Sequence, residues 1–169
     1  MPATIADLEA YLGELGIETK TVTHPPLHTV AESRALRGSI PGAHTKNLFL
    51  RDKKGALFLV TALEDAEIDL KRLHARIGAS GRFSFGKPDL LLETLGVVPG
   101  AVTPFGLIND SPPRLQVVFD AALMANGEVN CHPLVNTATT TIAAEDLIAF
   151  ARATDHDPQV IAIDEASRP

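Results

Sequence analysis

Cysteine, tryptophan and long apolar runs are scarce or absent in this chain of 169 residues, and each scarcity excludes a class of protein. Cys131 is the single cysteine, so no disulfide can form within the chain, and we expect a reducing compartment, the cytoplasm. The sequence contains no CxxC pair and no HExxH segment, which are the commonest zinc-binding patterns. We therefore expect neither a metal ion nor another cofactor.

No apolar stretch approaches the roughly 18 residues that a membrane-spanning helix needs, and the N-terminal residues form no basic leader. We therefore expect no membrane association. The chain has 21 acidic and 15 basic residues, and this formal net charge of −6 argues against duplex DNA as a partner. A local basic patch can still hold a few phosphates, so other nucleic-acid binding is disfavoured but stays open.

Two further patterns are missing. The serines lie outside any G-x-S-x-G segment, so a serine hydrolase is not supported. His24 and His28 are four residues apart, but Pro25 and Pro26 prevent the helix that would bring both rings to one metal ion. A zinc site is therefore not supported either.

The hydrophobic pattern predicts one domain over residues 1–169, of the α/β (α+β) class. Apolar residues at helical spacing predict helices over 5–15, 29–37, 69–77, 88–95 and 143–153. Alternating or β-branched runs predict strands over 18–22, 47–51, 56–61, 82–85, 115–119, 128–132, 139–142 and 160–163. Hairpins and helices are mixed rather than strictly alternating, so we expect a curved mixed β-sheet surrounded by helices.

Lys46 is the first candidate for chemistry. It follows the glycine-bracketed segment 38–42 and precedes a hydrophobic strand, so we expect its side chain to emerge where a sheet edge meets a loop. An ammonium group there can hold a phosphate. On position alone, an ordinary solvated lysine is the commoner outcome. Arg51, Lys53 and Lys54 nearby are expected at a solvated hairpin tip.

The second candidate is the loop Gly100–Pro104. It belongs to residues 96–110, which are too irregular for a helix and too broken for a central strand. Glycine permits unusual backbone angles, so consecutive N–H groups of this loop can point at one developing oxyanion. The alternative is an ordinary turn.

The third candidate is the pair Cys131 and His132. Adjacent residues of a strand face opposite sides, so these two side chains do not form a nucleophile and base dyad. We expect Cys131 in the core and His132 facing a cleft. The alternative for His132 is a structural histidine bonded to a carbonyl group.

Three segments taken together resemble a known family. They are TKNLFLRD at residues 45–52 with the following Lys-Lys-Gly, GAVTPFGL at 100–107 and HPLVNTATTT at 132–141, in the family's order. The family is the YbaK/aminoacyl-tRNA synthetase-associated domain group, related to the insertion domain of bacterial prolyl-tRNA synthetase. The resemblance covers about residues 4–154 and implies the fold of that insertion domain.

The resemblance also implies site residues and a substrate. Lys46, Gly100 and His132 match the family's catalytic motif positions. The implied substrate-binding residues are Asn47, Ala101, Val102, Thr103 and Pro104. The implied partner is the acceptor end of aminoacylated tRNA, and prolyl-tRNA synthetase is a further candidate partner.

The KNLFLRD form resembles most the branch that hydrolyses alanine wrongly attached to proline tRNA. One alternative is the branch that removes cysteine from the same tRNA. Another is a non-catalytic nucleic-acid-binding module that uses the basic residues 46, 51, 53 and 54. A partner of a synthetase without activity of its own also stays open.

An aminoacyl ester is already activated, so its hydrolysis needs a positioned water, a stabilised oxyanion and a selective pocket. Lys46, protonated at neutral pH, is expected to clamp the terminal phosphate rather than act as a base. A pocket that admits alanine and rejects proline would act as a second sieve. The predicted helix over 29–37 is expected to close over this pocket as a lid.

Overall fold

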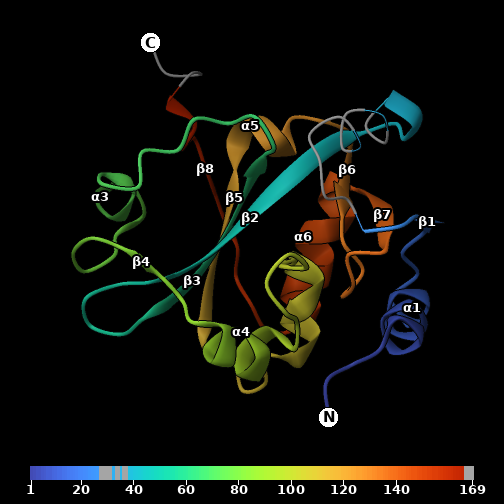
Figure 1. Ribbon diagram of the computed structural model, residues 1–169, viewed down its shortest axis with the longest axis horizontal. Coiled ribbons are helices and arrows are strands. Elements are labelled where there is room, and N and C mark those ends of the chain that lie inside the picture. The colour runs from blue at the N-terminus through green and yellow to red at the C-terminus, as the bar shows by residue number, and fades with distance from the viewer. Residues whose placement is uncertain (27–31, 33–34, 36–37, 166–169) are drawn as a thin grey trace.

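The computed structural model describes residues 1–26, 32, 35 and 38–165 (Figure 1). The elements in chain order are α1 (Ile5–Glu14), β1 (Thr19–Thr23), β2 (Ala43–Arg51), β3 (Leu57–Leu63), α3 (Leu73–Ile77), β4 (Ser84–Phe85), α4 (Pro88–Leu95), the 3-10 helix η1 (Pro104–Asn109), β5 (Leu115–Asp120), α5 (Ala121–Met124), β6 (Glu128–Cys131), β7 (Ala138–Ala143), α6 (Ala144–Ala153) and β8 (Gln159–Ile161). None of the helices among these residues is long and apolar enough to cross a membrane.

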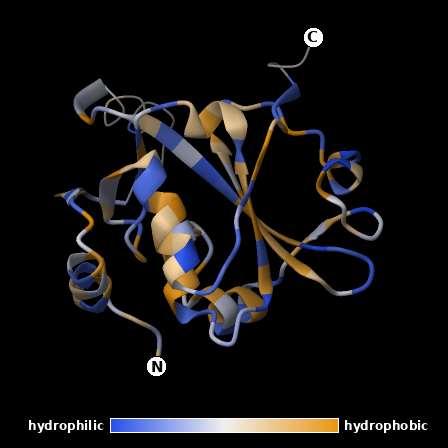
Figure 2. Cartoon of the chain, turned by 180° about the vertical axis from the view of Figure 1, so that it is seen from behind, coloured by the Kyte–Doolittle hydropathy of each residue, from blue (hydrophilic) through white to orange (hydrophobic). Residues whose placement is uncertain are grey.

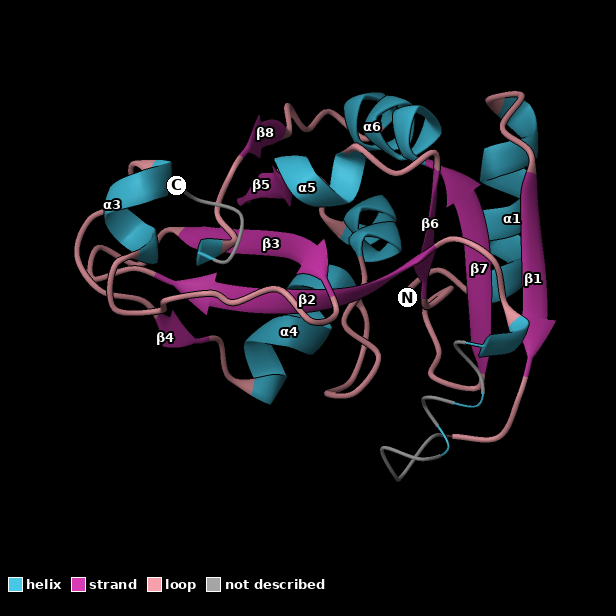
Figure 3. Ribbon diagram, turned by 90° about the horizontal axis from the view of Figure 1, so that it is seen from above, coloured by secondary structure: helices cyan, strands magenta, loops and turns pink. Residues whose placement is uncertain are grey.

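The strands form one mixed sheet in the order β1-β7-β6-β2-β3-β5-β8, and β4 pairs with β2. The β1–β7, β6–β7, β2–β3 and β2–β4 pairs are antiparallel, whereas β2–β6, β3–β5 and β5–β8 are parallel. The expected mixed sheet with surrounding helices is therefore confirmed. Figure 3 shows β2 crossing the molecule between β3 and the group formed by β6, β7 and β1.

Both faces of the sheet are covered where β2, β3 and β5 lie. The larger core packs α1, α4, η1, α5 and α6 against one face, with Phe105, Leu147 and Phe150 at its centre. The smaller core packs Leu73 and Ile77 of α3 against the opposite face. Figure 2 shows largely apolar ribbon along the central strands, apart from the hydrophilic first half of β2. Two-sided burial explains why these strands read as nearly continuous apolar runs.

Local sequence signals fix several element ends. Thr4 and Asp7 form the capping box of α1, with reciprocal bonds between each side chain and the other residue's backbone N–H. Gly78 ends α3 and Gly96 ends α4, each in the left-handed conformation that glycine adopts at low cost. Asp52 accepts backbone N–H groups of Lys54 and Ala56 and closes the β2–β3 turn.

Some predicted boundaries need correction. Residues 96–110 are not wholly irregular, because Pro104 opens η1, whose first turn is capped by the Thr103 hydroxyl. The strand predicted over 128–132 ends at Cys131, and β2 begins at Ala43 rather than Asn47. The helix and lid predicted over 29–37 lie outside the described residues, apart from positions 32 and 35.

Candidate active site

Strands β2 and β6 diverge, and a cavity opens beside the divergence. They pair only at Ala43 and His44, and no other described strand occupies that edge of β2 until β4 pairs at Leu50. The cavity measures about 200 Å³. Its walls come from β2, from the loop before η1 and from the residue after β6, and they are Thr45, Lys46, Asn47, Gly100, Val102 and His132. Five of these residues were predicted as site residues.

Lys46 lies inside β2, paired with Ala62 of β3, so the prediction that it precedes the strand is wrong. The expected sheet edge is nevertheless present, because β2 is open on its other side at this point. The Lys46 ammonium donates a hydrogen bond to the carbonyl oxygen of Ala66. An ammonium group has three donors, so two are left without an acceptor among the residues that the structure describes.

Asn47 is oriented by a buried residue that sequence reasoning missed. Thr61 of β3 is directly opposite Asn47, is fully buried, and donates its hydroxyl to Asn47 Oδ1 over 2.6 Å. Since Oδ1 is engaged, the Nδ2 group is the end of the amide that is left for a ligand. The antiparallel register of the predicted hairpin was the signal that could have identified Thr61.

The loop before η1 contributes backbone rather than side-chain chemistry. Gly100 has φ of 92°, a left-handed conformation that side chains rarely adopt. The Ala101 N–H donates to Val98 O and is therefore not available to a substrate. The N–H groups of Gly100 and Val102 have no acceptor among the described residues. Within this loop, the backbone N–H groups that can stabilise an oxyanion are therefore those of Gly100 and Val102.

Three predicted substrate contacts do not line the cavity. Ala101 is buried in the larger core, and Pro104 is buried at the start of η1. Thr103 is also fully buried, and its hydroxyl accepts the N–H of Phe105. These residues support the loop from behind, while Gly100 and Val102 face the cavity.

His132 faces the cavity from the end of β6, as expected. Its Nδ1 lies 3.1 Å from the carbonyl oxygen of Ala138. A carbonyl can only accept, so Nδ1 carries the hydrogen and Nε2 of the neutral ring keeps a lone pair. Burial lowers the pKa of His132, the bond to Ala138 raises it, and the nearby His24 lowers it; the net pKa is below 6.5. The ring is therefore neutral at pH 7.

His24 is a second histidine near the cavity. From the sequence, His24 was weighed only as a metal ligand, and that role was not supported. Its Nε2 lies 2.9 Å from the Thr139 hydroxyl, and its backbone N–H donates to Thr137 O. His24 and His132 are thus tied to neighbouring residues of β7. The β1–β7 pairing, which brings His24 to this end of β7, was not predictable from local sequence.

Cys131 lies in the larger core, as predicted, and its thiol is unreactive. Burial raises the pKa of its thiol to about 12, with a small opposing effect from Thr45. A thiol that stays protonated is a poor nucleophile. Thr45 also donates to the Asn130 carbonyl over 2.7 Å and so ties β2 to β6 where they diverge.

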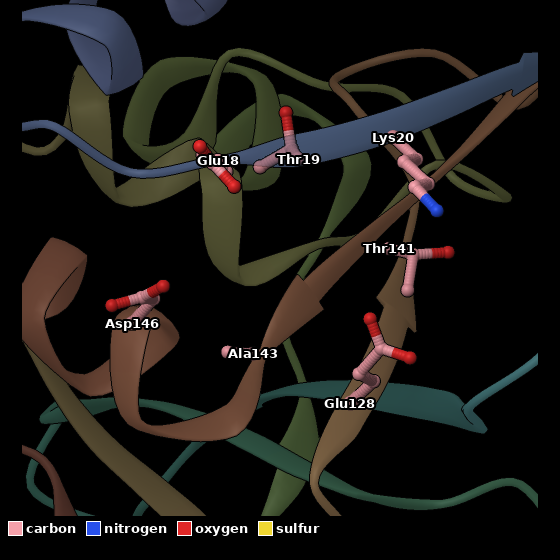
Figure 4. Close-up of a pocket in the computed structure, with 7 residues that line it drawn as sticks. All are labelled: Glu18, Thr19, Lys20, Glu128, Thr141, Ala143 and Asp146. Carbon is pink, nitrogen blue, oxygen red and sulfur yellow. The ribbon is translucent and has the colours of Figure 1, made fainter.

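A second and larger cavity, of about 420 Å³, lies at the end of β6 opposite His132 (Figure 4). Its walls come from β1, β6, β7 and α6, and the charged residues among them are Glu18, Lys20, Glu128 and Asp146. Figure 4 shows Asp146 and Glu128 on opposite sides of Ala143. Across the described residues no three metal-binding side chains converge. An excess of carboxylates repels phosphates, so this cavity does not suit a nucleic-acid end.

Comparison with known proteins agrees with the geometry. The sequence profile described as the aminoacyl-tRNA editing domain matches residues 24–150, a span that includes every residue lining the smaller cavity. This chain belongs to the aminoacyl-tRNA editing domain family.

Two curated relatives extend the comparison over most of the chain. Prolyl-tRNA synthetase associated domain-containing protein 1 of Mus musculus is 39% identical over 163 residues, covering 94% of this chain and 96% of the relative. The prolyl-tRNA editing protein ProX of Acetoanaerobium sticklandii is 39% identical over 145 residues, covering 85% of this chain and 88% of the relative.

A solved structure shares the fold. It is a crystal structure described as a candidate trans-editing enzyme for prolyl tRNA synthetase, with a TM-score of 0.74, 23% identity, and coverage of 98% of this chain and 99% of that one. At this identity the likeness establishes the fold only.

Proposed function

We propose that this protein is an aminoacyl-tRNA deacylase that hydrolyses alanine wrongly attached to proline tRNA. The observation that carries the proposal is that four residues with suitable groups line one small cavity. They are His132 with its neutral ring, Asn47 with its oriented amide, and Gly100 and Val102, whose backbone N–H groups have no acceptor among the described residues. Family membership and the relative named as a prolyl-tRNA editing protein support the choice of substrate.

The proposed reaction consumes one water molecule. The water oxygen attacks the ester carbonyl carbon, and the carbonyl oxygen becomes an oxyanion that Gly100 N–H, Val102 N–H or Asn47 Nδ2 can stabilise. The bond to the ribose oxygen then breaks, and a proton from the attacking water ends on that oxygen. The products are free alanine and tRNA with both ribose hydroxyls, so the chemistry is balanced without a cofactor.

The remaining groups orient rather than react. His132 Nε2 is an acceptor that can hold the attacking water or a substrate hydroxyl, because Ala138 fixes the proton on Nδ1. The two free donors of the Lys46 ammonium suit the phosphate of the terminal nucleotide. Val102 supplies the apolar wall, and the expected selectivity is that this wall accepts the alanine methyl group and excludes the larger proline ring.

The proposal is tested by incubating the purified protein with Ala-tRNA(Pro), Cys-tRNA(Pro) and Pro-tRNA(Pro), each compared with buffer. We expect rapid loss of alanine, slower loss of cysteine and no acceleration for proline. Preferential loss of cysteine would assign the protein to the other editing branch. No acceleration for any of the three would leave a binding function and overturn the proposal.

A further inference from the structure

The far end of β2 carries an unusual concentration of positive charge. Residues 51–56 and 78–87 contain five basic residues and one acidic residue, in a chain that is acidic overall, and the nearest further acidic residue along the second segment is the exposed Asp89. All five basic side chains are exposed, and they are Arg51, Lys53, Lys54, Arg82 and Lys87. None of them forms an ion pair within the described part of the chain, whereas Arg76 and Arg114 do.

Contacts between the two segments place these charges at one end of the molecule. The Lys53 N–H donates to Ser80 O, and Asp52 accepts the Ser80 N–H over 3.0 Å. Gly81 has φ of 80°, and a side chain there would collide with the Lys53 stem. The two segments therefore form one surface, which we call the hairpin tip and define as residues 51–56 and 78–87. Figure 1 shows the β2–β3 turn beside the β4 segment.

The acidic residue at the hairpin tip, Asp52, is buried, and its carboxylate is hydrogen-bonded within the protein. Asp52 is 6% exposed and accepts three backbone N–H groups, from Lys54, Ala56 and Ser80. The surface of the tip is thus positive. Phe85 of β4 adds an aromatic ring that is 61% exposed. Exposed cations next to an exposed aromatic ring are typical of surfaces that contact a nucleic-acid strand.

Strand β2 connects the hairpin tip to the cavity. Asn47 lines the cavity, and Arg51 lies four residues further along the strand, which is about 13 Å at about 3.3 Å per residue. A duplex rises about 3.4 Å per nucleotide along its axis and an unpaired strand is more extended, so about 13 Å is spanned by four nucleotides or fewer. A nucleic acid whose end lies in the cavity can therefore reach the hairpin tip.

We propose that the hairpin tip binds the phosphate backbone of the tRNA while the aminoacylated end lies in the cavity. This inference rests on the proposed function, because it assumes that the cavity holds the end of a tRNA. The cations supply affinity that does not depend on base sequence, and Phe85 supplies a face for a ribose or an unpaired base. The tip acts in binding and leaves the hydrolytic step to the cavity.

The test compares the K53E/K54E double variant with K20E/R152E, which reverses two charges on β1 and α6 instead. Affinity for uncharged tRNA(Pro) is measured over a range of salt concentrations. We expect K53E/K54E to weaken binding at least 10-fold at low salt. The plot of log affinity against log salt should also become less steep, with a slope smaller in magnitude by about 1.5. K20E/R152E is expected to change affinity less than 2-fold. Equal losses in both variants, or none in K53E/K54E, would overturn the inference.

Hydrolysis of two substrates separates this inference from the proposed function. With Ala-tRNA(Pro), K53E/K54E should need a higher enzyme concentration for half-maximal rate but reach the wild-type single-turnover rate at saturation. With alanyl-adenosine, which carries no phosphate and is too short to reach the tip, the variant and wild type should be equal. Loss of alanyl-adenosine hydrolysis would place the tip in the chemistry and contradict the inference. Inactivity of the wild-type protein on both substrates would reject the proposed function, and the tRNA affinities would still decide the role of the tip.

Discussion

Asn47 is half-buried in the cavity wall, and its amide can act as a specific donor only if its orientation is fixed. The hydroxyl of Thr61 fixes it by donating to Oδ1, and Thr61 itself has no solvent exposure. Without that bond the amide can turn, and its donor would point at the substrate only part of the time. Thr61 is in this sense a positioning residue for the proposed reaction.

Replacing Thr61 with valine is expected to lower the single-turnover rate about 5-fold, because one hydrogen bond contributes about 1 kcal/mol. Thr61→Ser should restore the rate. In an Asn47→Ala background, Thr61→Val should have no additional effect. Thr94→Val is the matched control, since Thr94 is also buried but its hydroxyl has no partner among the described residues. Additive losses from Thr61→Val and Asn47→Ala would contradict the positioning role.

The protonation of His132 determines how the rate of hydrolysis is expected to depend on pH. Its pKa is lowered below 6.5 by burial, and the neutral ring is the form with a free Nε2 lone pair. The single-turnover rate should therefore be constant above about pH 7, in excess over the buffer reaction, and fall as the pH drops through the lowered pKa. His132→Gln should remove this acidic limb. A limb whose midpoint lies above pH 6.5 would show that His132 is not buried and neutral as described.

At the scale of elements, a buried hydrogen bond between His156 and Asp110 joins the end of α6 to the segment between η1 and β5. His156 follows α6, and its Nε2 lies 2.8 Å from Asp110 Oδ2, with both side chains almost fully buried. Asp110 also accepts the N–H groups of Arg114 and Leu115. Because α6 supplies Leu147 and Phe150 to the larger core, this pair holds one of the helices on which the core depends.

Asp110→Ala is expected to destabilise the fold, because the buried donors of Leu115 and His156 lose their acceptor, at a cost of about 1–3 kcal/mol each. Glu93→Ala, which breaks the exposed pair with Arg114, should cost less than about 1 kcal/mol. Denaturant unfolding at pH 7 measures both. Equal, small effects would mean that water or another group replaces the lost partner.

The same pair predicts how stability depends on pH. Burial raises the pKa of Asp110, but the bonds from His156, Leu115 and Arg114 outweigh it, so the pKa lies below 3.8. A carboxyl group whose pKa is lowered by folding stabilises the protein above its unfolded pKa, and this contribution is lost as the pH falls through the folded value. Stability of the wild type should therefore drop more steeply below about pH 4 than that of Asp110→Asn. Parallel curves would contradict this contribution.

At the scale of the whole molecule, local pattern predicted the elements better than their arrangement. The hairpin of β2 and β3, the helix α4 and the burial of Cys131 follow from periodicity and turn residues. The parallel pairing of β2 with β6, and hence the divergence that opens the cavity, joins residues more than 80 positions apart. Such pairings depend on long-range packing, which no local window contains.

The site shows the same limit. The motif segments identified Lys46, Asn47, Gly100, Val102 and His132, and all five line one cavity. They could not show that Thr61 orients Asn47, or that the Ala101 N–H donates a hydrogen bond to the Val98 carbonyl oxygen. Hydrogen-bond partners across strands and within turns are properties of the folded backbone, so these roles required the structure.

The central claim is that the smaller cavity, and not the larger acidic one, hydrolyses the aminoacyl ester. The most direct measurement is the release of free alanine from Ala-tRNA(Pro) in a single turnover by two space-filling variants. Val102→Phe, which fills the smaller cavity, should lower the rate at least 100-fold, whereas Ala143→Leu in the acidic cavity should leave it within 2-fold of the wild type. Wild-type alanine release by Val102→Phe, or its loss in a well-folded Ala143→Leu protein, would contradict the account.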